Sequence, residues 1–359
     1  MGYINSLITK LCTPPTLYPI PTTPLNNILK KSKFKVLRRF IRRFMNVAIK
    51  GQLKLELEYI KQEHKKILWV SLNMPQIGDS LMDLSSRVLL KDRKVDLFSK
   101  ENVCSLFRYD DFFNRLISNE KELVDKRYDL IIIDIFKKKS IAFKSKYLKN
   151  NQYVSMGRYY DEGEFNRTLF SFCRMYTLLN IPVSYEEVTE NANLMLSLPE
   201  KTFDSVDAIE ECKKSFITIT TGGVHSFRIY NKWKEIVELI IKKYPKINIV
   251  LVGSRNGVES ALEISNLYPV TDLTDKLTIF ETAEVLRRSK LMICADGGLL
   301  HLTNSMGTPV IGLFAGGVFP EMRMSGLKNS KGLYSENNVS EISPEEIMGE
   351  VNRLIRNPI

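Results

Sequence analysis

The sequence predicts an α/β protein with two doubly wound domains and a basic helical extension at its N-terminus. Its 359 residues are enough for two domains of ordinary size. Short apolar runs alternate with segments of helical periodicity in two successive rounds, a pattern typical of parallel sheets covered by helices. A polar, charged segment at residues 199–214 separates the two rounds, so we expect domains at residues 67–205 and 206–359.

The extension, residues 1–66, holds the whole net charge of the chain. It carries 14 Lys and Arg against 3 Asp and Glu, a net charge of +11, and the remainder is neutral. Between residues 26 and 50, basic side chains lie mostly opposite an apolar stripe with helical spacing. The stripe consists of Phe34, Leu37, Ile41, Phe44 and Ala48. Such a helix can bind an anionic membrane surface or pack its stripe on the body of the protein, and the sequence leaves both interpretations open.

Other features of composition indicate the cellular setting. The five cysteines are scattered without a C-x-x-C pair, so we expect reduced thiols. Prolines interrupt the first 25 residues and leave no apolar core for a secretory signal, and no apolar run approaches the ~20 residues of a membrane span. We therefore expect a cytoplasmic protein, peripheral on the inner face of the cytoplasmic membrane if the basic helix binds lipid. Nucleic acid is not an expected partner, since the body has no recognition motif to accompany the basic patch.

The first round of the pattern places one carboxylate at a strand end. Strands are expected at residues 67–72, 95–98 and 130–136, and helices at residues 80–90 and 166–179. Asp79 stands between the first strand and the first helix. An ionised carboxylate there could accept a proton from an incoming hydroxyl. A helix cap is the alternative, and the spacing alone favours the cap.

The second round leads into a unit with a glycine turn at its crest. Strands are expected at residues 216–220, 247–252, 291–294 and 310–314, with helices at residues 232–243, 257–266, 282–288 and 299–306. Because glycine turns and helix N-termini direct backbone N–H groups at one point, the loops after the first and third of these strands suit a diphosphate. The residues concerned are Thr221, Gly222, Gly223, Asp296, Gly297, Gly298 and His301.

Two further residues of this domain are candidates for donor binding. Lys232 opens a helix and could place a positive charge against phosphate. Glu259 lies just inside the next helix and could accept hydrogen bonds from a ribose or a base, although a solvated first-turn glutamate is the commoner explanation. No metal cluster, P-loop or G-x-G-x-x-G fingerprint is present, and no D-x-D lies in a turn that would face the ligand. We therefore expect neither a metal nor a cofactor.

Taken in order, these segments resemble glycosyltransferase family nine, the heptosyltransferase family of bacterial lipopolysaccharide synthesis. Residues 293–301 resemble the family's D-T-G-x-x-H turn, residues 307–309 its G-x-P, and residues 67–70 with 77–79 its opening strand and G-D turn. The resemblance implies a GT-B architecture, with two Rossmann-like domains facing across a cleft. The acceptor then binds the N-terminal domain and the nucleotide sugar the C-terminal one, and transfer inverts the anomeric centre without a metal.

The resemblance also implies roles for single residues. The aspartate matching Asp79 is the family's proposed general base, and the residues matching Asp296, Gly298 and His301 line the sugar-diphosphate site. The chain departs from the family in three ways. No arginine occurs in residues 71–76, Gly297 replaces a threonine, and Asn231 stands where the family often has a phosphate-binding lysine, with Lys232 beside it.

The predicted function is that of an inverting, metal-independent glycosyltransferase. It would move a heptose or hexose from a nucleotide-diphosphate sugar to a hydroxyl of a lipopolysaccharide-type or other cell-surface glycan or glycolipid. The alternative is a non-catalytic GT-B-like protein that binds a glycan or nucleotide sugar at the membrane surface. Asp79, Asp296 and His301 occur together, which favours the enzyme, because a binding protein has no need of a general base.

Overall fold

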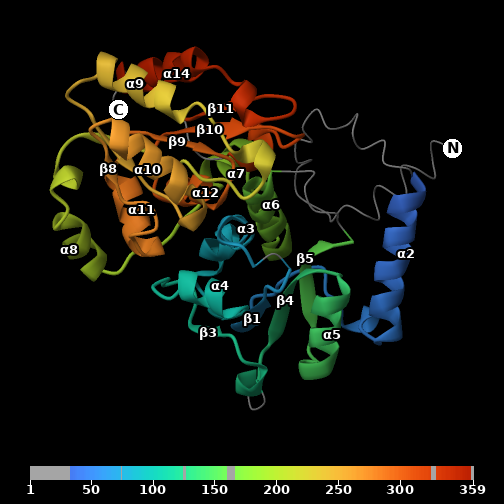
Figure 1. Cartoon of the computed structure of the whole chain (residues 1–359). Helices are drawn as coiled ribbons and strands as arrows, with labels where there is room; N and C mark the ends of the chain where they lie inside the picture. The colour runs from blue at the N-terminus through green and yellow to red at the C-terminus, as the bar shows by residue number, and fades with distance from the viewer. Residues whose placement is uncertain (1–32, 74, 124–126, 160–165, 325–328, 357–359) are drawn as a thin grey trace. The chain divides into compact units, whose positions relative to one another are not determined.

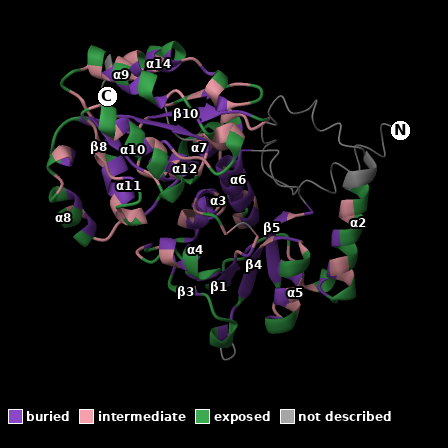
Figure 2. Cartoon of the chain, in the orientation of Figure 1, coloured by how far each residue is buried: buried purple, intermediate pink, exposed green. Residues whose placement is uncertain are grey.

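The computed structural model describes residues 33–73, 75–123, 127–159, 166–324 and 329–356 (Figure 1). The chain divides into two compact units, Met1–Ala192 and Asn193–Ile359. We call them unit 1 and unit 2. This division falls before the boundary expected between residues 205 and 206. Each unit holds a parallel sheet whose strands are mostly buried, as Figure 2 shows in purple.

The described part of unit 1 contains a five-stranded parallel sheet with the order β3-β2-β1-β4-β5. Its central strands are almost entirely buried and apolar, as expected for a parallel sheet that is covered on both faces. The strands are β1 (Lys66–Val70), β2 (Lys94–Phe98), β3 (Arg115–Ile117), β4 (Leu130–Ile135) and β5 (Tyr153–Arg158). The order reverses between β1 and β4, and this reversal is the switch point of a doubly wound sheet.

The helices of unit 1 follow the expected alternation with strands. Where a single helix was expected at residues 80–90, the chain forms a short α-helix and then a 3₁₀ segment, Ser85–Leu90. The α-helices are α2 (Lys33–Ile49), α3 (Ile77–Asp83), α4 (Glu101–Leu106), α5 (Lys138–Tyr147), α6 (Arg167–Leu179) and α7 (Tyr185–Asn191). Asn166 caps α6, since its side chain accepts a hydrogen bond from the backbone N–H of Leu169.

The described part of unit 2 contains a six-stranded parallel sheet with the order β11-β10-β9-β6-β7-β8. Its strands are β6 (Phe216–Ile219), β7 (Asn248–Leu251), β8 (Thr271–Asp272), β9 (Met292–Ala295), β10 (Val310–Phe314) and β11 (Lys331–Tyr334). The order reverses between β6 and β9. Both units therefore have the doubly wound topology predicted from the sequence, and the fold class is confirmed.

Helices cover the sheet of unit 2. They are α8 (Lys201–Asp207), α9 (Trp233–Lys243), α10 (Val258–Leu267), α11 (Ile279–Arg288), α12 (Gly298–Ser305), α13 (Pro320–Arg323) and α14 (Pro344–Arg356). A capping box between Thr278 and Glu281 starts α11. The expected helices at residues 232–243, 257–266, 282–288 and 299–306 are confirmed, and their ends differ from the expected ones by at most three residues.

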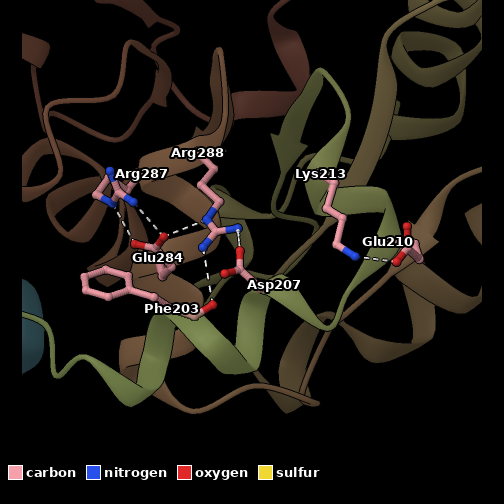
Figure 3. A network of polar contacts seen from close by, with 7 residues as sticks. All are labelled: Phe203, Asp207, Glu210, Lys213, Glu284, Arg287 and Arg288. Atoms are coloured by element: carbon pink, nitrogen blue, oxygen red, sulfur yellow. Dashed lines mark hydrogen bonds and ion pairs between the residues drawn. The ribbon is translucent and has the colours of Figure 1, made fainter.

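The segment expected to be a linker, residues 199–214, instead contains α8 and a 3₁₀ turn. Arg288 joins α11 to α8, because its guanidinium lies 2.5 Å from Asp207 and donates to the carbonyl oxygen of Phe203, both in α8 (Figure 3). Glu284 of α11 accepts hydrogen bonds from both Arg287 and Arg288. This polar network explains why a segment poor in apolar residues belongs to unit 2.

The basic helix of the extension is present as α2, from Lys33 to Ile49. Residues 26–32 of the expected helix, and the side chain of Phe34, lie outside what the structure describes. Within the described ranges, no helix is both long enough and apolar enough to cross a bilayer.

Candidate functional site

Unit 2 has a pocket at the switch point of its sheet. Ligands of doubly wound sheets bind at the carboxyl ends of the strands on either side of this point. The loops after β6, β7 and β9 converge there around a pocket of about 120 Å³. Its lining includes Thr220, Gly222, Gly223, Val224, Arg228, Ser254, Asn256, Ala295, Asp296, Gly297, Gly298 and Leu299. The structure thus brings together five of the predicted donor-binding residues, Gly222, Gly223, Asp296, Gly297 and Gly298.

Close backbone packing explains the two glycines after β6. A Cβ on Gly222 would lie 2.7 Å from Asn256 Oδ1 and 3.0 Å from the backbone nitrogen of Gly257. A Cβ on Gly223 would lie 2.7 Å from the carbonyl oxygen of Arg228. Any side chain at these positions would push the neighbouring loops apart, so the glycines are required for the shape of the pocket.

The opposite wall is the turn between β9 and α12. Gly297 is the N-cap of α12 and supplies no capping side chain, and Gly298 begins the helix. The first N–H groups of a helix have no partner within the helix, and the helix dipole adds a partial positive charge at this end. This wall is therefore suited to the oxygens of an anion.

Arg228, which the sequence analysis did not single out, supplies a full positive charge to this pocket. Its Nη2 lies 3.1 Å from Oδ2 of Asp296, and its Nη1 donates to the backbone oxygen of Asp296 at 3.4 Å. The Asp296 side chain is 4% exposed and that of Arg228 is 19% exposed. The ion pair offsets the negative charge that Asp296 would otherwise place beside a bound anion. The sequence signal was slight, because an arginine in a loop usually indicates a solvated surface.

The remaining predicted donor-binding residues of unit 2 do not line this pocket. Thr221 is buried and donates to the carbonyl oxygen of Gly257 at 2.9 Å, so it joins the loops after β6 and β7. His301 is buried in α12, with Nε2 4.0 Å from Oδ1 of Asp296. Lys232 is the N-cap of α9, and Glu259 is an exposed residue in the first turn of α10.

Asp79, the predicted base, lies in the first turn of α3 in unit 1. The N-cap of this helix is Gln76. The Asp79 carboxylate forms an ion pair with Nη1 of Arg167, and the same guanidinium also pairs with Asp83. Arg167 Nε donates to Oδ1 of Asp83 at 2.8 Å. Ion pairs between α3 and α6 thus hold the Asp79 side chain in place. Neither the general base nor the helix cap that the sequence suggested for Asp79 predicted this arginine partner.

A second pocket, of about 50 Å³, lies at the switch point of unit 1 beside this cluster, and Asp79 is not among the residues that line it. Asp83, Asp134 and Arg167 line it, together with Trp69, Ser71 and Asn73 and apolar side chains from β5 and α6. Asp134 was not singled out from the sequence. Burial raises its pKa to about 6, although Ser140 Oγ and the N–H groups of Ile135 and Leu72 donate to the carboxylate.

The described residues contain no group of three His, Cys, Asp or Glu side chains that could hold a metal ion. The four cysteines among these residues, Cys104, Cys173, Cys212 and Cys294, are all free and buried.

Comparison with known proteins gives the family. The model of glycosyltransferase family 9 (heptosyltransferase) matches residues 164–346, which include α6 and nearly all of unit 2. No curated protein sequence matches the chain. Solved structures match most of it at low sequence identity, so they show the shared fold.

The first is a glycosyl transferase of family 9 from Veillonella parvula, with 16% identity, a TM-score of 0.65, and coverage of 83% of this chain and 99% of the other. E. coli ADP-heptose lipopolysaccharide heptosyltransferase II has 15% identity and a TM-score of 0.63, covering 81% and 98%. E. coli heptosyltransferase WaaC, determined with ADP, has 15% identity and a TM-score of 0.61, covering 80% and 99%. Because the family model spans just over half of the sequence, the chain belongs to glycosyltransferase family 9.

Proposed function

We propose that this glycosyltransferase moves a heptose or hexose from a nucleotide-diphosphate sugar to a hydroxyl of a lipopolysaccharide-type or other cell-surface glycan, with inversion and without a metal. The observation that carries the proposal is the pocket of unit 2. It combines two glycine turns, a helix N-terminus and Arg228 at the switch point of a doubly wound sheet. WaaC was determined with ADP, so ADP-linked sugars are the first donors to test.

In this proposal the diphosphate lies against the backbone N–H groups of the two glycine loops and the guanidinium of Arg228. These groups would stabilise the negative charge that develops on the leaving diphosphate. His301 would support that wall of the pocket from behind, through its position next to Asp296, which lines the pocket. Lys232 and Glu259 remain predictions from the sequence, as contacts to phosphate and to the nucleoside.

Asp79 is the proposed base. The acceptor hydroxyl would give its proton to the Asp79 carboxylate while its oxygen attacks the anomeric carbon from the face opposite the leaving group. The bond from the anomeric carbon to the diphosphate oxygen breaks, and the nucleoside diphosphate leaves with the electron pair. An arginine partner favours the ionised carboxylate, which is the form that accepts a proton. Arg167 also limits the directions that Asp79 can adopt, so the acceptor must approach beside it.

We also propose that the acceptor is lipid-anchored and that the protein works at the inner face of the cytoplasmic membrane. The basic extension supports this location, since attraction to anionic lipid would bring the enzyme to such an acceptor.

Donor binding is tested first. Thermal shifts measured with ADP-, UDP-, GDP- and CMP-linked sugars should single out one nucleotide, because only a ligand that binds the folded state raises the melting temperature. No shift with any donor would contradict the assignment of the pocket. Turnover of the bound donor with a glycan acceptor, in the presence of EDTA, then tests metal independence, and the anomeric configuration of the product tests inversion. Donor binding without turnover would favour the non-catalytic alternative.

Asp79→Asn tests the base. We expect turnover to fall by about 10²–10⁴ while donor binding stays within about twofold of the wild type. Asp83→Asn is the matched control, because it neutralises the other carboxylate held by Arg167. It should cost much less turnover than Asp79→Asn. Equal losses in the two variants would mean that Asp79 serves the ion pair only.

A further inference from the structure

Helix α2 is attached to unit 1 along one narrow face. The ring of Phe40 packs on that of Tyr159 with centroids 4.7 Å apart, and Arg43 Nη1 donates to the carbonyl oxygen of Tyr159 at 2.8 Å. Val47 is fully buried in the core of the unit. These three residues lie one helical turn apart, so a single side of the helix is anchored.

The apolar stripe predicted from the sequence is not the side that packs. Leu37, Ile41 and Phe44, three of its members, are exposed, and Met45 and Ile49 extend the same surface. The exposed fractions of these five side chains run from 37% to 75%. At about 100° per residue they fall within an arc of about 140°, whose centre lies about 140° from that of the anchored side. Phe44, at the edge of this arc, also stacks on Phe40. Figure 2 shows exposed positions along the helix. We call this surface the outer apolar face of α2.

Positive charge borders this face. Arg38 and Arg42 are exposed and lie along the edge formed by Met45 and Ile49, and Lys50 follows the helix. Residues 26–50 contain no Asp or Glu, so no carboxylate of this segment neutralises the arginines. Pairing with the same helix of a second copy would place these arginines beside each other. A surface that offers both hydrocarbon and negative charge is the complementary partner.

We propose that the outer apolar face of α2 docks on the surface of an anionic lipid bilayer. The apolar side chains enter the boundary between headgroups and acyl chains, and Arg38 and Arg42 contact lipid phosphates. The anchored side, through Phe40, Arg43 and Val47, transmits this attachment to unit 1. The inference extends the proposed location at the membrane and requires neither the donor nor the acceptor.

The test uses the full chain and vesicles. Sedimentation is compared with phosphatidylcholine vesicles and with vesicles that also contain phosphatidylglycerol. We expect binding to the anionic vesicles only, weakened by salt. The double variant Ile41→Gln/Met45→Gln removes hydrocarbon from the outer apolar face and should weaken binding at least about tenfold. Arg38→Gln/Arg42→Gln should weaken the preference for phosphatidylglycerol, and the other basic residues of the extension should retain part of it.

Leu262→Gln/Leu267→Gln provides the matched control, because these leucines are similarly exposed on α10 of unit 2. It should bind vesicles like the wild type. Wild-type protein that stays in the supernatant, or α2 variants that sediment like the control, would overturn the proposal. So would α2 variants that change the oligomeric state in solution, because the face would then be an interface between copies. The ADP-sugar thermal shift, measured on the same variants, should be unchanged, so loss of vesicle binding and failure of the donor site are distinguishable.

Discussion

The ion pair between Arg228 and Asp296 can be tested by a double-mutant cycle. Arg228→Met keeps much of the side-chain stem but leaves the Asp296 carboxylate buried without its guanidinium. At 3.1 Å, two unit charges attract by about 5 kcal/mol at an effective dielectric constant of 20, and the desolvation of both groups offsets part of this. Because Arg228 keeps some contact with water, we expect Arg228→Met to cost about 3 kcal/mol of unfolding free energy.

Asp296→Asn should cost less, about 1 kcal/mol, since the guanidinium that it leaves can turn toward solvent. The two single losses add up to about 4 kcal/mol of unfolding free energy, but the double variant Arg228→Met/Asp296→Asn should lose only about 2 kcal/mol, because the second substitution removes a charge that the first left unpaired. Urea unfolding measures these free energies. The chain has two tryptophans, and Trp233 lies in α9 of unit 2, so a Trp69→Phe background makes fluorescence report on that unit. Single effects that add within about 0.5 kcal/mol would refute the reasoning.

The same variants separate two views of donor binding. The sequence analysis proposed phosphate binding by Lys232, next to the position where the family often has a lysine, whereas the pocket contains Arg228. If the geometry is right, Arg228→Met should weaken ADP binding about tenfold, equivalent to about 1.4 kcal/mol. Lys232→Met should change it by less than about twofold. Titration calorimetry with ADP measures both, and the reverse order would favour the assignment from sequence.

Three further predictions concern stability. The pKa of Asp134 is raised to about 6, so the folded protein binds a proton on this carboxylate more tightly than the unfolded chain does. The stabilisation that comes from the protonated Asp134 is therefore full below about pH 3.8 and is lost as pH rises through 6. The difference in unfolding free energy between wild type and Asp134→Asn should therefore fall by about 3 kcal/mol from pH 3.5 to 7, and a flat difference would contradict the shift. Glu284→Ala should cost about 3 kcal/mol in urea unfolding, because its fully buried carboxylate binds Arg287 and Arg288; a loss below about 1 kcal/mol would show that the network in Figure 3 adds little. Gly222→Ala should cost about 1–3 kcal/mol through its contact with Gly257, whereas Gly297→Ala should be neutral or stabilising; equal costs would contradict the difference in packing.

The sequence predicted the strands of both sheets best where burial is complete. The runs that became β1, β4, β6, β9 and β10 are apolar because both faces of these strands are covered, and this pattern is visible without any tertiary information. α8 was missed for the opposite reason. It is held through Asp207 and Arg288, which are 81 residues apart, and periodicity reports only on neighbours in the sequence.

The same limit decides which features of the candidate sites could be predicted from the sequence. The glycine turns after β6 and β9 were predicted because they follow buried strands, and their meeting in one pocket follows from the strand order. The partners of the carboxylates could not be predicted. Arg167 lies 88 residues from Asp79, and Arg228 lies 68 residues from Asp296. Asp134 interrupts an apolar run and was counted as part of the strand, although the shift of its pKa depends on the surrounding pocket.

The glycines of the unit 2 pocket are not equivalent, and this bears on the choice of donor. A Cβ on Gly223 would meet the backbone oxygen of Arg228 at 2.7 Å, and one on Gly222 would meet Asn256 Oδ1 at 2.7 Å and the backbone nitrogen of Gly257 at 3.0 Å. Gly297 has an extended backbone that any residue adopts, and the nearest atom to its Cβ position would be 3.9 Å away. Packing therefore does not explain why glycine replaces the family's threonine there. The missing side chain leaves space in the pocket wall beside Asp296. If the proposed donor site is right, the loop after β6 keeps the shape on which diphosphate binding would depend, and position 297 is where this chain can differ from its relatives in the donor it accepts.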